Sequence, residues 1–189
     1  VVLHHDEFIY QGFGGFLQDL KGLTLRYLPT PKYLCEGMLW RLAPLWDPTV
    51  DYVFCRDLDA IIVPRELKEM KKFLDSEKEL HLMHDHPLHA GMMGGMTGIK
   101  ASAFRARTNT FSLTDFFAKY SHRLSEKGDD QDLLNQCIAP LFPEDTIYRS
   151  KDVTKNSVPE ELDSLVQAIG WMPSPEVAMK TLNRPLILK

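Results

Sequence analysis

Short apolar runs alternate along the chain with segments of helical period, and this alternation is the feature that most constrains the fold. The runs predicted to be strands lie at 1–5, 23–29, 50–56, 80–84 and 145–149. The segments predicted to be helices lie at 31–46, 64–74, 112–124 and 130–141. A turn and a brief helix are expected after the first strand, and a loop at 85–100. Strands that alternate with helices predict an α/β fold, with a mostly parallel, Rossmann-like sheet flanked by helices.

Length and composition favour a single domain over residues 1–189. The chain is 44% hydrophobic and 25% charged, enough to bury a sizeable core. From about residue 151 the sequence is richer in proline and lacks a strong period, so 151–189 is expected to form an arm or a lid. The chain opens without methionine, and we expect a domain that belongs to something longer.

Charge and cysteine usage exclude several classes of protein. The formal net charge of −4 comes from mixed rather than blocked charges, which argues against a nucleic-acid partner. No apolar run approaches the roughly 18 residues that a membrane span needs. The three cysteines are widely separated and odd in number, so neither a disulfide framework nor a thiolate zinc site is indicated. A reducing, cytoplasmic location fits best.

Two carboxylates follow the predicted strand at 50–56. Asp57 and Asp59 are two positions apart, so in extended backbone both point to one side, with Cα atoms roughly 6.6 Å apart. Two like charges beside an apolar run need a cation or a set of donors between them. The pair therefore suggests a site for Mn²⁺ or Mg²⁺, which prefer oxygen ligands. The alternative is a solvated turn in which Asp59 forms a salt bridge with Arg56 or Arg65.

A second candidate segment is the loop DHPLHAGMMGG, which begins at Asp85 and follows the predicted strand at 80–84. Ligands of open α/β sheets bind beyond the carboxyl ends of strands, so this loop should be a neighbour of Asp57. Asp85 and His86 could contact a sugar, while Gly94 and Gly95 let the backbone approach a sugar or phosphate closely. Alternatively, the glycines only form turns and the histidines are structural.

A third acidic cluster stands at the start of the predicted helix at 130–141. Asp129, Asp130 and Asp132 crowd this position together with Gln131. One or two of them suffice to cap the helix and to complement its dipole. The remaining acidic residue and the glutamine are free to face a ligand.

Taken in order, WRLAPLWDPTVDYVFCRDLDAIIV, MHDHPLHAGMMGGMTGIK and DDQDLLN resemble the motifs of the GT-A glycosyltransferases, over roughly residues 36 to 136. They are most similar to family 8, the glycogenin and lipopolysaccharide galactosyltransferase group. The resemblance implies a GT-A-like fold and transfer of a sugar from a nucleotide-diphosphate donor, UDP-sugar first, to a glycan, lipid or protein acceptor. Retention of anomeric configuration is implied as well.

The resemblance also assigns roles to residues. Arg41, Arg56 and Asp57 would bind the donor together with the turn Gly94–Gly95. Asp57 and Asp59 would hold manganese, or magnesium, on the donor diphosphate. Asp130 and Gln131 would lie at the reacting sugar, and Asp85 and His86 on the sugar or acceptor loop.

The chain departs from the family pattern in three ways. The family has a late histidine that binds the metal, whereas all seven histidines here lie at or before His122. The asparagine of the family's sugar-binding turn is absent. The first family strand would lie upstream of Val1.

Two other functions compete with the transferase. VFCRDLDA and GDDQD also resemble two motifs of haloacid-dehalogenase phosphatases, with Asp57 as nucleophile, Asp59 as acid, and Asp129 or Asp130 on magnesium. A catalytically inactive module that binds a sugar nucleotide or a glycan is the other alternative.

Overall fold

The computed structural model of the chain describes residues 1–150 apart from positions 34, 58–61, 63 and 84–90. It divides into two compact units. The first comprises Val1–Val53 and Ala101–Leu141, and the second comprises Phe54–Lys100 and the residues from Phe142 onward. The predicted arm or lid at 151–189 lies outside the described residues.

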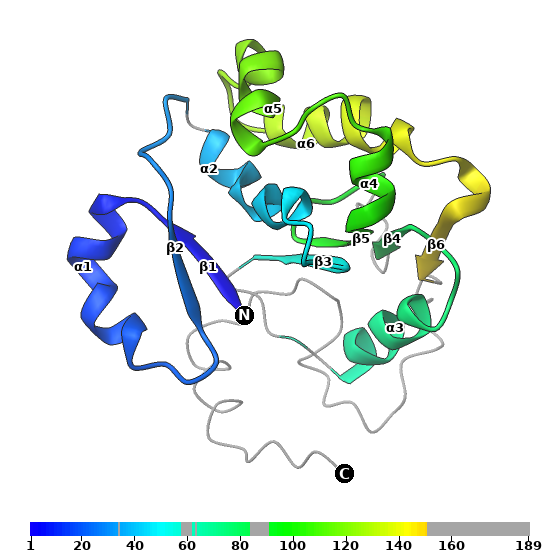
Figure 1. Cartoon of the computed structure of the whole chain (residues 1–189), viewed down its shortest axis with the longest axis horizontal. Coiled ribbons are helices and arrows are strands. Elements are labelled where there is room, and N and C mark those ends of the chain that lie inside the picture. The colour runs from blue at the N-terminus through cyan, green and yellow to red at the C-terminus, as the bar shows by residue number, and fades with distance from the viewer. Residues whose placement is uncertain (34, 58–61, 63, 84–90, 151–189) are drawn as a thin grey trace. The chain divides into compact units, whose positions relative to one another are not determined.

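The first unit begins with a parallel strand pair joined by a helix. β1 (Val2–His5) and β2 (Thr24–Tyr27) pair in parallel, with His5 opposite Tyr27. α1 (Glu7–Gln18) connects them (Figure 1), as parallel neighbours need a crossover connection. Both strands were predicted, but α1 is twelve residues long rather than brief.

The rest of the first unit is helical. Its elements are α2 (Glu36–Leu39), η1 (Trp40–Trp46), α4 (Ala101–Arg107), α5 (Leu113–Tyr120), η2 (Ser121–Arg123), α6 (Asp129–Leu133), η3 (Leu134–Ile138) and η4 (Ala139–Leu141). Trp46 lies in their core, with its ring 5.2 Å from that of Phe104 and 5.8 Å from that of Phe116. Its indole N–H donates a hydrogen bond to the carbonyl of Thr110 at 3.0 Å, so the polar edge of the ring is satisfied.

The helix predicted at 31–46 begins later than expected. The structure starts α2 at Glu36 and continues it as the 3₁₀-helix η1, which contains Pro44. The carboxylate of Glu36 accepts hydrogen bonds from the backbone N–H groups of Lys32 (2.6 Å) and Tyr33 (3.4 Å). These bonds hold the residues after Pro31 outside the helix, because their N–H groups have a side-chain acceptor instead.

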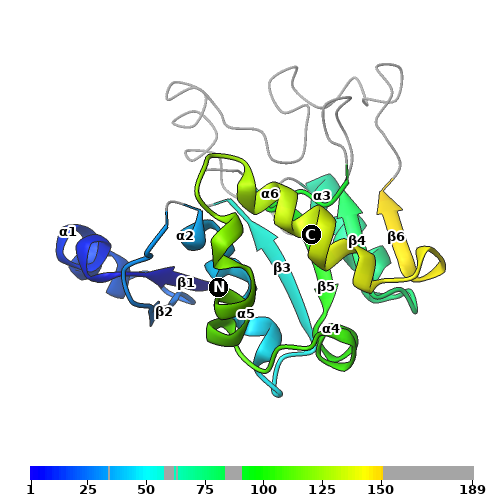
Figure 2. The ribbon, with the colours of Figure 1, turned by 90° about the horizontal axis from the view of Figure 1, so that it is seen from above.

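The second unit is built on a four-stranded sheet. Its strands are β3 (Tyr52–Arg56), which begins in the first unit, β4 (Leu80–Met83), β5 (Met96–Lys100) and β6 (Ile147–Ser150). They lie side by side in the order β3, β5, β4, β6 (Figure 2). β4 is antiparallel to β5 and parallel to β6, so the sheet is mixed and the prediction of a mostly parallel sheet is wrong.

β5 was missed because positions 85–100 looked like one glycine-rich loop, and α4, which follows it, was not predicted either. Gly98 lies inside β5, where a Cβ atom would come within 2.7 Å of the Phe54 ring and 3.1 Å of His81 Cβ. The glycine therefore leaves room for the neighbouring strands' side chains. It does not mark a turn.

α3 (Pro64–Leu74) packs on the sheet through Phe73, whose ring contacts those of Phe54 and His81. The side chains that α3 buries are not simply its apolar ones. Leu67 and Leu74 are exposed, whereas Glu66 and Glu69 are buried. The short 3₁₀-helix η5 (Glu144–Thr146) precedes β6. In the part of the chain that the structure describes, no helix is long and apolar enough to cross a membrane.

Candidate functional site

Asp57 follows β3 directly and lies against a glycine turn. Gly94 and Gly95 form that turn just before β5, and the N–H of Met96 closes it on the carbonyl of Met93 at 3.1 Å. A Cβ atom at Gly95 would overlap the Asp57 carboxylate, with Oδ1 at 2.8 Å and two other atoms of the group still closer. Gly95 is needed here for space, since its φ is not in the left-handed region.

Arg56 fixes the geometry of this turn. Its Nη1 donates a hydrogen bond to the carbonyl of Gly95 at 3.0 Å, and its Nε lies 2.8 Å from Oε1 of Glu66. The Glu66 side chain, in the first turn of α3, is 0% exposed and that of Arg56 is 12% exposed. One guanidinium thus joins the end of β3, the first turn of α3 and the glycine turn.

Two sequence hypotheses concern Arg56. The solvated-turn alternative paired it, or Arg65, with Asp59, which lies outside the described residues, so that pairing stays a hypothesis. Donor contact by Arg56 stays a prediction. Sequence reasoning also missed Glu66, because its partner Arg56 comes from another element, ten residues earlier in the chain.

A buried polar cluster lies within the same sheet and helix. His81 on β4 is fully buried, its Nε2 is 2.9 Å from the hydroxyl of Ser150, and its ring stacks on Phe73 at 5.2 Å. Its Nδ1 finds no hydrogen-bond partner among the residues that the structure describes. Burial lowers the pKa of His81 to about 4, although the Glu69 carboxylate acts in the opposite direction. The imidazole is therefore neutral at pH 7.

Glu69 and Tyr148 complete this cluster. The Tyr148 hydroxyl donates to Glu69 Oε2 at 2.8 Å, and Lys72 Nζ lies 2.5 Å from Oε1 of the same carboxylate. Burial and the Glu69 contact raise the pKa of Tyr148 to about 12. Burial alone would raise the pKa of Glu69, but the two donors outweigh it and the pKa is lowered. Nothing in the sequence singled out Glu69, which stands among lysines and glutamates of α3.

The other described candidates belong to the first unit. Arg41 lies in η1, where its Nε donates to the carbonyl of Met38 at 2.6 Å. Asp130 and Gln131 lie in the first turn of α6, after Gly128, which has φ of 100°. Asp129 accepts the backbone N–H of Glu126 at 2.6 Å, so it stabilises the turn that leads into the helix. The roles of Asp130 and Gln131 at a reacting sugar stay predictions.

Asp59, Asp85 and His86 lie outside the described residues. Within the described ranges no group of three or more His, Cys, Asp or Glu side chains could hold a metal ion. Asp57, directly after β3, carries a hard carboxylate of the type that Mn²⁺ and Mg²⁺ prefer, and metal binding by Asp57 and Asp59 stays a prediction.

Fold and site together define an α/β protein with mixed sheets and an aspartate at the end of a strand. Comparison with protein-family models, with curated proteins and with solved structures gave no significant match.

Proposed function

We propose that the protein is a metal-dependent glycosyltransferase with a GT-A-like fold. It would move a sugar from a nucleotide-diphosphate donor, a UDP-sugar first, to a glycan, lipid or protein acceptor. The motif order of the sequence supports this proposal. One observation in the structure supports it further: the Asp57 carboxylate lies so close to the backbone of Gly95 that a Cβ atom there would displace it.

The position of Asp57 suits the binding of a diphosphate. Ligands of α/β sheets bind beyond the ends of strands, and Asp57 is the first residue after β3. The neighbouring turn has two glycines, so a sugar or phosphate can approach its backbone closely. Arg56 and Glu66 hold this turn from the buried side.

Asp57 and Asp59 would hold Mn²⁺ or Mg²⁺ together with the donor phosphates. The bound ion would neutralise the charge that grows on the leaving diphosphate. The anomeric carbon would exchange its bond to the diphosphate oxygen for one to an acceptor oxygen, whose proton leaves. Gly94 and Gly95 would make room for the sugar, and Asp130 and Gln131 would lie near the reacting carbon.

Calorimetric titration of UDP into the protein, with and without Mn²⁺, tests the proposal. We expect binding that requires the metal and is lost in Asp57→Asn and in Asp59→Asn. Asp51→Asn is a matched control, because it removes the charge of an exposed aspartate just before β3. Nucleotide sugars would then be ranked by affinity and by release of UDP.

Two results would overturn the transferase. One is the absence of metal-dependent nucleotide binding by folded protein. The other is Asp57-dependent release of phosphate from p-nitrophenyl phosphate, which would point to the phosphatase instead.

A further inference from the structure

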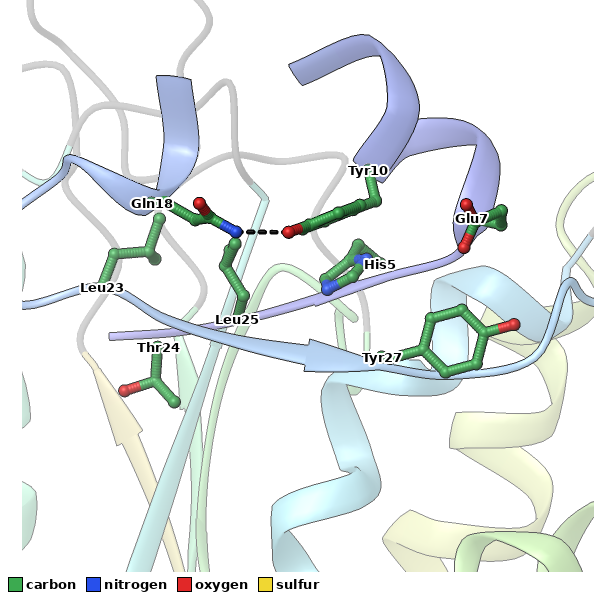
Figure 3. Close-up of a pocket in the computed structure, with 8 residues that line it drawn as sticks. All are labelled: His5, Glu7, Tyr10, Gln18, Leu23, Thr24, Leu25 and Tyr27. Carbon is green, nitrogen blue, oxygen red and sulfur yellow. Dashed lines mark hydrogen bonds between the residues drawn. The ribbon is translucent and has the colours of Figure 1, made fainter. Parts of the chain in front are cut away.

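A pocket of about 610 Å³ opens on the first unit, where α1 lies over β1 and β2 (Figure 3). Its size is within the usual range for sites that bind small molecules. The residues that matter here are His5, Glu7, Tyr10, Gln18, Leu25 and Tyr27. His5 and Tyr27 are opposite each other at the carboxyl ends of the two parallel strands, a common place for a ligand.

Three rings form one side of the pocket. His5 is buried and stacks on Tyr10, with ring centroids 5.3 Å apart and an angle of 23° between the planes. Tyr27 meets His5 edge-on at 6.0 Å and is 58% exposed. His5 thus packs against the ring of Tyr10. The exposed ring of Tyr27 can be contacted by a ligand that enters from solution.

The polar groups of the pocket are held by contacts within α1. Gln11 Nε2 donates a hydrogen bond to Glu7 Oε1 at 3.0 Å. The side-chain amide of Gln18 donates to the hydroxyl of Tyr10, as Figure 3 shows. A planar carboxylate and a planar amide are therefore oriented beside exposed ring surface before any ligand arrives.

The charge of the lining residues limits the class of ligand that the pocket can bind. Among the lining residues that the structure describes, and with histidine counted as neutral, Glu7 is the only charged one. Anions such as phosphates and nucleotide diphosphates are therefore disfavoured. A cage for an organic cation needs several ring faces that point at one centre. Here His5 and Tyr10 cover each other's faces instead.

We propose that this pocket binds an uncharged saccharide. A sugar ring has a face of C–H groups, which suits Tyr27, and hydroxyl groups at its edge, which suit the carboxylate of Glu7 and the amide of Gln18. The apolar side chain of Leu25 completes the lining. The inference uses no residue of the Asp57 site, so it stands or falls independently of the proposed transferase.

Ligand-detected NMR titration of the full chain provides the test. The probes are the methyl glycosides of glucose, galactose and mannose, the disaccharides maltose and lactose, and, as competing classes, choline and uridine. We expect at least one saccharide to bind with Kd of about 1 mM, the strength usual for a ligand of this size in a surface pocket. Neither choline nor uridine should compete with it.

Two variants test whether the saccharide binds in this pocket. Tyr27→Ala should weaken saccharide binding about tenfold, because the ring surface is lost. Phe111→Ala is the matched control, since Phe111 is 88% exposed and does not line the pocket. It should leave the affinity unchanged. Circular dichroism would verify that each variant is folded.

Glu7→Gln covers the case in which Tyr27→Ala fails to fold. It keeps the hydrogen-bonding shape and removes the charge, so saccharide binding should change less than about threefold while binding of a cation would be lost. The proposal is overturned if no saccharide binds, if choline or uridine binds instead, or if binding tolerates Tyr27→Ala as well as it tolerates Phe111→Ala.

Discussion

The turn at Asp57 and the pocket beside α1 differ in how their polar side chains are held. Glu66 is buried, Arg56 is only 12% exposed, and together they join three elements that are far apart in the sequence. Glu7 and Gln11 are exposed and lie one turn apart on a single helix. Removing one partner of a buried pair leaves an uncompensated charge, whereas exposed pairs contribute little. Stability should therefore depend on the first region and hardly on the second.

The largest effect is expected from Glu66→Gln. The substitution keeps the shape of the side chain but removes the buried negative charge that faces the Arg56 guanidinium. We expect the free energy of unfolding, measured in urea, to fall by about 3–5 kcal/mol. Asp75→Asn is the control, because it breaks the exposed pair with Lys71, whose side chains are 74% and 62% exposed. That change should cost less than about 1 kcal/mol. Equal losses of unfolding free energy in the two variants would contradict the difference between the buried pair and the exposed pair.

A pH dependence should come from His81 in the same unit. Its pKa of about 4 in the folded protein lies below the ordinary value of 6.5, so the unfolded chain binds the proton more readily. The resulting stabilisation is fully present above pH 6.5 and is lost as the pH falls toward 4. We expect a loss of up to about 3 kcal/mol across this window.

Urea unfolding at pH 7 and at pH 4.5 would measure this loss. In His81→Leu the contribution of this group should disappear, leaving a shallower slope. A slope that is unchanged in the variant would assign the acid sensitivity to other groups.

Glycine substitutions compare the two regions directly. Gly95→Ala should destabilise the protein by about 1–3 kcal/mol, because the new methyl group overlaps the Asp57 carboxylate. Metal-dependent UDP binding should be lost with it. Gly12→Ala on α1 meets no atom within 4 Å and should raise stability by roughly 0.5–1 kcal/mol. If Gly95→Ala bound UDP normally, the close contact with Asp57 would be irrelevant to function.

Elements set by local patterns could be predicted from the sequence. β1, β3 and β4 were expected because apolar residues gather in short runs, and α5 because its residues follow a helical period. In the structure Ser112 caps α5 by accepting the N–H of Asp115. β5 could not be predicted, because Gly98 is needed to leave room for Phe54 and His81 on neighbouring strands, which are distant in the sequence. The antiparallel direction of β4 relative to β5 depends on the same long-range packing.

The candidate site, like the fold, has residues that local sequence patterns indicate and residues that depend on long-range contacts. The sequence singled out Asp57 and Gly95 by motif, and the structure places them in contact. It could not reveal that Glu66 and Glu69 are buried, because their partners Arg56 and Tyr148 come from other elements. Glutamates on a helix rich in lysine look like a solvated face until those partners are known.

The smallest effect on stability is expected from Gln11→Ala. The variant removes the hydrogen bond to Glu7, an i,i+4 contact on the exposed side of α1, so the free energy of unfolding should change by less than about 0.5 kcal/mol. The Glu7 carboxylate would then be free to turn, and saccharide affinity should fall about two- to threefold through lost preorganisation. Thermal unfolding and NMR titration of one sample would measure both. A large loss of stability would mean that α1 depends on this contact, and the contrast with the Asp57 turn would fail.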